Sequence, residues 1–134
     1  RPEGIISDSE SVYICCTSGG NLRKGQIFKI NTISPEQSSA ELWYEVQDNS
    51  SLNMPDNIVI APWGDLIVCE DNSDRNRLWG LTPNGNPYLI AQNSYSGSEF
   101  AGACFSPIDN TMFVNIQGSG LTLIIDGNWN SVVS

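Results

Sequence analysis

The side chains best able to do chemistry in this sequence are carboxylates. Histidine is absent from the 134 residues, which removes the commonest general base and the usual zinc ligand. Fifteen aspartates and glutamates outnumber six lysines and arginines, for a formal charge of −9. Because hard cations such as Ca²⁺ prefer carboxylate, amide and carbonyl oxygens, this inventory favours cation binding over histidine-based nucleophilic catalysis.

The acidic candidates lie where predicted strands begin or end. Glu3, Asp56 and Glu99 come within three residues of the start of a strand, and Glu70 with Asp71 ends another. Successive side chains of a strand point to opposite sides, so Glu70 and Asp71 should face different ways. Acids brought together would raise each other's pKa unless a cation neutralised them, although the same acids could simply cap loops.

The elements that must position these groups are short strands in an ordered repeat. Runs of Val, Ile, Leu and aromatic residues end at Gly, Pro, Asn or Asp, and no window shows helical spacing. Three hairpins recur, and each is followed by a third strand. Their ranges are 4–15, 57–69 and 102–115, with third strands at 26–30, 77–81 and 121–125. A fourth strand follows in the first two copies, at 41–46 and 87–91.

The copies start about 45 to 53 residues apart. A repeat of this length is typical of β-propeller blades, each a four-stranded antiparallel sheet. We therefore predict an all-β chain forming one partial propeller domain over residues 1–134, with blades at about 1–53, 54–97 and 98–134, the last incomplete. Three blades make an open arc that would need the rest of a propeller or a partner chain. The alternative is a single β-sandwich of the same strands. Blade geometry would gather Glu3, Asp56, Glu70 and Glu99 on one rim of the channel.

Several segments resemble the PhoX-type alkaline phosphatase family. They are RPEG at 1–4, CTSGG at 16–20, PDNIVIAPWGDLIVCED at 55–71, SEFAGACFSP at 98–107 and MFVNIQ at 112–117. The resemblance implies the C-terminal half of a six-bladed, exported propeller in which Ca²⁺ and Fe³⁺ ions hydrolyse phosphate monoesters. It also implies that Arg1 contacts the substrate phosphate and that the metal ligands present here are Glu3, Asp56, Asn57, Glu70 and Glu99. Asp71 ranks behind these candidates, because it points to the other side of the strand from Glu70.

The family's remaining metal ligands, including a cysteine on iron, would lie upstream of Arg1. The four cysteines present, Cys15, Cys16, Cys69 and Cys104, match no zinc or haem spacing, and we expect them to be free. The family's Gly-Pro-Trp ending is replaced by Gly127-Asn128-Trp129, a change of turn only.

Two other functions fit the same residues. One is a non-catalytic propeller subunit or scaffold in a larger assembly, and the other is a calcium-dependent lactonase-like hydrolase. The negative charge argues against a nucleic acid partner. No stretch is apolar enough to span a membrane. The resemblance places the protein in an exported compartment, such as the periplasm, the extracellular space or an organelle lumen.

Overall fold

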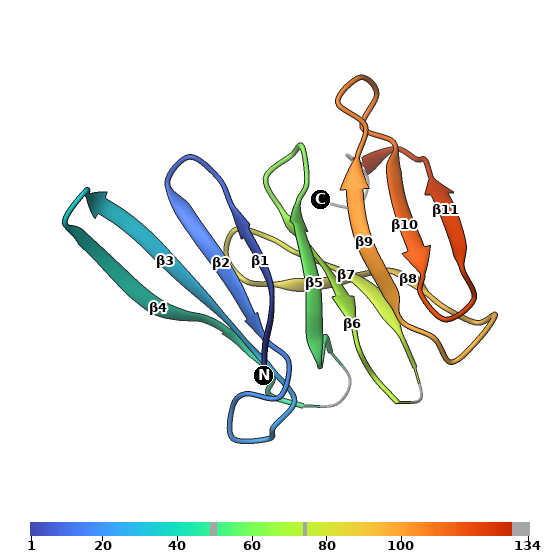
Figure 1. The fold of residues 1–134 in the computed structure, drawn as a ribbon, viewed down its shortest axis with the longest axis horizontal. Coiled ribbons are helices and arrows are strands. Elements are labelled where there is room, and N and C mark those ends of the chain that lie inside the picture. The colour runs from blue at the N-terminus through green and yellow to red at the C-terminus, as the bar shows by residue number, and fades with distance from the viewer. Residues whose placement is uncertain (49–50, 74, 130–134) are drawn as a thin grey trace.

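Eleven β-strands in three antiparallel sheets make up the structure, a computed structural model that describes residues 1–48, 51–73 and 75–129 (Figure 1). Sheet 1 contains β1 (Pro2–Ser7), β2 (Ser11–Cys16), β3 (Gln26–Ser34) and β4 (Gln37–Glu45). Sheet 2 contains β5 (Pro55–Ile60), β6 (Leu66–Glu70), β7 (Arg77–Leu81) and β8 (Pro87–Gln92). Sheet 3 contains β9 (Phe100–Phe105), β10 (Met112–Ile116) and β11 (Leu121–Ile125).

Strands that are consecutive in sequence are neighbours in every sheet, because short turns connect them. The turn between β1 and β2 is closed by Asp8, whose Oδ1 accepts hydrogen bonds from the backbone N–H groups of Glu10 and Ser11, both at 2.7 Å. Asn110, in the turn between β9 and β10, has a φ of 60°, which asparagine tolerates better than most residues. These turn residues explain why the apolar runs end where they do.

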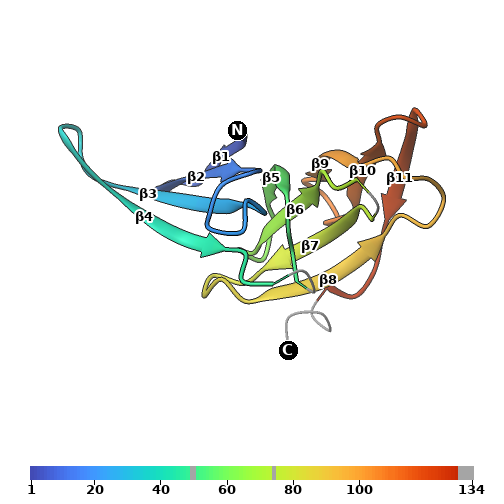
Figure 2. The same cartoon turned by 90° about the horizontal axis from the view of Figure 1, so that it is seen from below.

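The three sheets stand in a row, with sheet 2 in the middle (Figure 2). Their first strands are neighbours, β1 beside β5 and β5 beside β9. The approach is tightest at Gly4, where an added Cβ would lie 2.2 Å from the carbonyl oxygen of Asp56. Between β5 and β9, the Asn57 side-chain oxygen accepts a hydrogen bond from the Gly102 N–H at 2.9 Å. The first strands therefore bring the polar groups at their ends close together.

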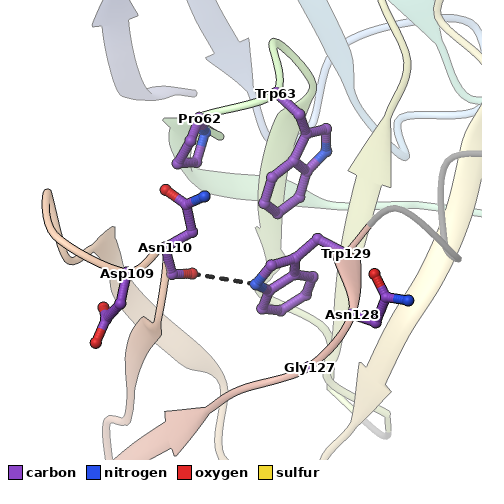
Figure 3. A pocket seen from close by; sticks show the side chains of 7 residues that line it. All are labelled: Pro62, Trp63, Asp109, Asn110, Gly127, Asn128 and Trp129. Carbon is purple, nitrogen blue, oxygen red and sulfur yellow. Dashed lines mark hydrogen bonds between the residues drawn. The ribbon is translucent and has the colours of Figure 1, made fainter.

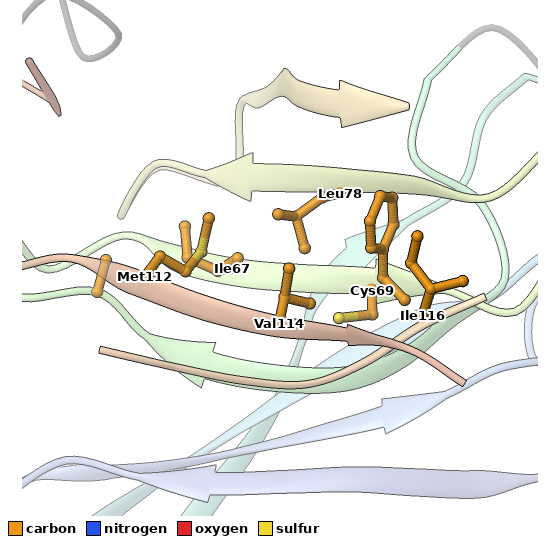
Figure 4. Close-up of a cluster of buried hydrophobic side chains, with 8 residues drawn as sticks. Ile67, Cys69, Leu78, Met112, Val114 and Ile116 are labelled. Carbon is orange, nitrogen blue, oxygen red and sulfur yellow. The ribbon is translucent and has the colours of Figure 1, made fainter. Parts of the chain in front are cut away.

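Two hydrophobic cores fill the spaces between the sheets. The core between sheets 1 and 2 buries Cys15 and Ile27 against Leu66, Val68 and Leu81. The core between sheets 2 and 3 is drawn in Figure 4, where sheet 2 residues meet sheet 3 residues. Its labelled members are Ile67, Cys69, Leu78, Met112, Val114 and Ile116. Sheet 2 is thus covered on both faces, which stabilises the middle of the molecule most.

The predicted all-β class and the sets of four, four and three strands are confirmed. Three stacked sheets are present, where the alternative sandwich required two. The β3–β4 hairpin is longer than expected, because the polar residues 31–40 continue the pairing beyond the apolar run. Closure into a propeller stays a prediction. Within the described residues, the structure contains no helix long and apolar enough to cross a membrane.

Candidate functional site

Arg1 is the centre of a group of charged side chains at the start of β1. Its Nε lies 2.9 Å from Oε1 of Glu3, and its Nη2 forms a second ion pair with Oδ2 of Asp71. The side chains are partly exposed, by 48% for Arg1, 39% for Glu3 and 36% for Asp71. A guanidinium held this way stays accessible to a ligand from solvent, and each ion pair is worth little while water screens it.

Backbone hydrogen bonds hold these residues in place. The N–H of Thr17, just after β2, donates to the carbonyl of Arg1 at 2.9 Å, and the N–H of Asp71, just after β6, donates to the carbonyl of Met54 at 2.9 Å. Arg1 and Asp71 therefore lie on extensions of the paired strands, so their positions follow from the strand registers of sheets 1 and 2.

Asp56 and Glu99 complete the group, and both have raised pKa values. Burial raises the pKa of Asp56 most, and the charges of Glu3 and Asp71 raise it further. Burial, followed by the charges of Asp71 and Asp56, raises the pKa of Glu99 to about 7. We call Glu3, Asp56, Asp71 and Glu99 the acidic rim. Carboxylates that raise each other's pKa in this way occur at cation-binding and catalytic sites and also in structural charge clusters.

Two oxygen atoms of the acidic rim are buried without a hydrogen-bond partner. They are Oδ1 of Asp56 and Oε2 of Glu99, and Oγ1 of Thr17 shares this property. An unpaired buried acceptor costs about 1–3 kcal/mol, so such atoms are rare in folded proteins. Two unpaired carboxylate oxygens beside an arginine are therefore suited to a ligand that supplies positive charge.

The acidic rim is not arranged as a closed metal cage. In residues 1–48, 51–73 and 75–129, no group of three or more His, Cys, Asp or Glu side chains is positioned to hold a metal ion. Two of the rim carboxylates bind Arg1, which acts as their counter-ion. The chemical nature of the donors, all oxygen, fits Ca²⁺ and Fe³⁺ better than softer metals. A cation bound here would have to draw the carboxylates away from the guanidinium.

The structure brings together most of the predicted site residues. Arg1 lies within electrostatic reach of Glu3, Asp56 and Glu99, and Asp56 lies within reach of Glu3 and of Glu99. Asn57 lies beside Asp56, but its side-chain oxygen accepts the N–H of Gly102. Asp71, which the sequence analysis ranked behind Glu70, takes a central place through its ion pair with Arg1.

Glu70 lies in a different environment, fully buried in a polar network. Its carboxylate accepts hydrogen bonds from Arg77 Nε at 2.8 Å, Trp79 Nε1 at 2.9 Å and the backbone N–H of Asn53 at 2.9 Å. The Arg77 guanidinium also stacks over the Trp79 ring, 4.8 Å from its centroid. Glu70 and Asp71 point to opposite sides of the strand, as expected. Glu70 is the residue that points inward, where it binds Arg77 at the start of β7. Strand alternation alone could not show this choice, because it depends on a contact between β6 and β7.

A hollow of about 260 Å³ lies among the turns, and no residue of the acidic rim lines it (Figure 3). Its wall contains Trp63 and Trp129, whose rings stack at 5.0 Å, and the Trp129 Nε1 donates to the Asn110 carbonyl at 3.1 Å. Among the described residues that line the hollow, Asp109 alone is acidic.

Comparison with known proteins gives one match. A family model described as alkaline phosphatase PhoX matches residues 1–120. No curated protein and no solved structure matches the chain. The matched range contains Arg1 and every residue of the acidic rim.

Proposed function

Because the chain belongs to the PhoX alkaline phosphatase family, we propose that Arg1 and the acidic rim form part of a cation-dependent site that hydrolyses phosphate monoesters. The observation that carries this proposal is the pair of unpartnered buried oxygens, on Asp56 and Glu99, beside the Arg1 guanidinium. We further propose that ligands from outside this chain, or from an upstream part of the protein, complete the site. We also propose that the protein is exported from the cytosol.

Arg1 would bind the phosphate group. A planar guanidinium donates parallel hydrogen bonds to two phosphate oxygens, with a geometry that lysine cannot reproduce. Its present partners, Glu3 and Asp71, hold the guanidinium in place, and its hydrogen bond to Asp71 together with the charges of Asp71 and Glu3 raises the pKa of Arg1. A phosphate ester therefore meets an oriented, permanently charged group, which lowers the entropic cost of orientation.

Glu3, Asp56, Asp71 and Glu99 would hold the cations, proposed as Ca²⁺ and Fe³⁺. When bound, such ions stabilise negative charge on the phosphoryl oxygens during transfer to water. Asp71 replaces Glu70 in our ligand set, since the Glu70 oxygens already accept hydrogen bonds from Arg77, Trp79 and Asn53. Asn57 stays a proposed ligand through reorientation of its amide, which now binds β9.

The test combines an aryl phosphate assay with elemental analysis of the purified protein. We expect phosphate release, bound calcium and iron, and an Arg1→Ala variant slowed by about tenfold or more, because a lost charge-assisted bond of about 1.4 kcal/mol or more has that effect. Glu3→Gln should lose metal as well as activity. Arg75→Ala, an exposed arginine outside the site, is the matched control and should keep both. Normal metal content in Glu3→Gln would contradict the ligand assignment.

A non-catalytic role is the second candidate, favoured by one observation. Within the described part of the chain, the acidic side chains form no preassembled metal group. A scaffold would release no phosphate and bind no iron, and its Arg1→Ala variant would behave as wild type. Calcium binding without iron, together with ester hydrolysis that spares phosphate monoesters, would instead support the lactonase-like alternative.

A further inference from the structure

Asn76 is a buried asparagine between two loops that carry carboxylates of the acidic rim. It lies directly before β7 and is only 1% exposed. The first loop follows β6 and carries Asp71, and the second precedes β9 and carries Glu99. The two loops belong to different sheets, so strand pairing within a sheet does not fix the distance between them. A side chain that binds both loops can fix this distance.

The side-chain amide of Asn76 binds both loops. On the side of Asp71, its Oδ1 accepts the Asn72 N–H at 2.7 Å, and its Nδ2 donates to the Asn72 carbonyl at 3.0 Å. On the side of Glu99, the same Nδ2 donates to the Gly97 carbonyl at 2.9 Å. Only one orientation of the amide satisfies these partners, because two of them are acceptors and the other is a donor.

Asn93 strengthens the connection on the side of Glu99. Its backbone N–H donates to the Asn76 carbonyl at 2.9 Å, and its Nδ2 donates to the Ser98 carbonyl at 2.7 Å. Side-chain amides therefore hold the successive carbonyls of Gly97 and Ser98, directly before Glu99. Removing one partner of a buried hydrogen bond is costly, because the other partner is left without water. The position of Glu99 thus depends on these two asparagines.

The two carboxyl groups carried by these loops interact with each other. After burial, the charge of Asp71 is the largest influence that raises the pKa of Glu99, and a side-chain hydrogen bond between the two groups contributes as well. Asp71 also forms an ion pair with Arg1, and Oε2 of Glu99 is buried without a hydrogen-bond partner. A movement of either loop would therefore change the spacing of two carboxylates in the acidic rim.

We propose that Asn76 is a positioning residue of the acidic rim, which holds the Asp71 and Glu99 carboxylates at the separation that a bound cation requires. The inference rests on the proposed function, because it gives Asn76 a part in cation binding at the same site. Asn76 touches neither the cation nor the phosphate ester, and it acts through the backbone of the two loops. Loss of groups that orient metal ligands in this way typically costs about 10–100-fold in metal affinity.

Calcium titration of the purified full-length protein by calorimetry tests this role. We expect Asn76→Ala to weaken calcium binding by about tenfold or more. In metal-free protein, the same variant should speed amide hydrogen exchange at Asn72, whose N–H loses its acceptor. Leu66→Val, a loss of packing at the opposite end of β6, is the control. It should lower the melting temperature and leave calcium affinity unchanged.

The outcomes separate this inference from the proposed function. Normal calcium affinity in Asn76→Ala would overturn the positioning role and leave the proposed function intact. A wild type that binds no calcium would overturn both. Asn93→Ala is the second variant, in case Asn76→Ala does not fold. It removes the bond to Ser98 on the side of Glu99, so it should also weaken calcium binding, and normal affinity there would count against the inference.

A double-mutant cycle distinguishes positioning from a general loss of stability. If Asn76 acts by placing Glu99 against Asp71, then Asn76→Ala should weaken calcium binding much less in a Glu99→Gln background than in the wild type. In a Glu3→Gln background it should keep its full effect, because the Asn76 side chain binds the loops after β6 and before β9 and not β1. Equal effects in the two backgrounds would overturn the positioning role.

Discussion

Arg1 and the acidic rim form a site whose charges balance only in part. Two carboxylates neutralise the guanidinium, while Asp56 and Glu99 keep one buried, unpartnered oxygen each. The arrangement differs from an ordinary surface ion pair, because burial raises the pKa of Asp56 and of Glu99. The charges of neighbouring carboxylates raise both pKa values further. The site therefore has unused affinity for positive charge, which its single arginine does not satisfy.

The raised pKa of Glu99 predicts that stability depends on pH in protein from which a chelator has removed metal. Its pKa is raised from 4.5 to about 7 in the folded state, so the folded protein binds this proton more tightly than the unfolded chain. The stabilisation is complete below about pH 4.5 and is lost as pH rises through about 7. The melting temperature should therefore fall between about pH 5 and pH 8. Glu99→Gln should remove much of this fall.

Calcium supplies the control for that experiment. Cation binding requires the ionised carboxylate, so added Ca²⁺ at about pH 8 should raise the melting temperature of the wild type more than that of Glu99→Gln. Asp109→Asn, at an exposed turn outside the acidic rim, should follow the wild type in both conditions. Equal responses of the wild type and Glu99→Gln would show that Glu99 does not participate.

At the scale of the element, the buried pair of Glu70 and Arg77 connects the end of β6 to the start of β7. We predict that Arg77→Met lowers the free energy of unfolding by about 3–5 kcal/mol, because it leaves the fully buried Glu70 carboxylate without its cation. Denaturant unfolding measures this change. Arg75→Met, two residues earlier and exposed, should stay within about 0.5 kcal/mol of the wild type. A small effect of Arg77→Met would mean that water reaches the Glu70 carboxylate.

Gly4 controls how closely β1 approaches β5. An alanine Cβ there would lie 2.2 Å from the carbonyl oxygen of Asp56, and backbone cannot move aside as a flexible side chain can. We predict that Gly4→Ala costs about 1–3 kcal/mol of stability through overpacking. Gly127→Ala is the matched control, since nothing lies within 4 Å of its added Cβ. If the two variants unfold at the same denaturant concentration, the approach of the two strands is looser than the structure shows.

The elements were more predictable from sequence than the site. Short apolar runs and the turn residues that end them located every strand, because local patterns and short connections dominate this fold. The choice between Glu70 and Asp71 was harder, since alternation says that two neighbours differ but not which one faces the rim. The decision depends on Arg77 and on the bulge between Pro55 and Ile58, where pairing with β6 shifts register. Such long-range partners cannot be read from spacing alone.

On the scale of the whole molecule, stability should be greatest in the middle of the row of sheets. Sheet 2 packs on both faces, whereas sheets 1 and 3 each pack on one within the described structure. Repeating architectures derive their stability from nearest-neighbour contacts, so the end sheets open more readily. We predict the slowest amide hydrogen exchange in β6 and β7, and much faster exchange in β4 and β11.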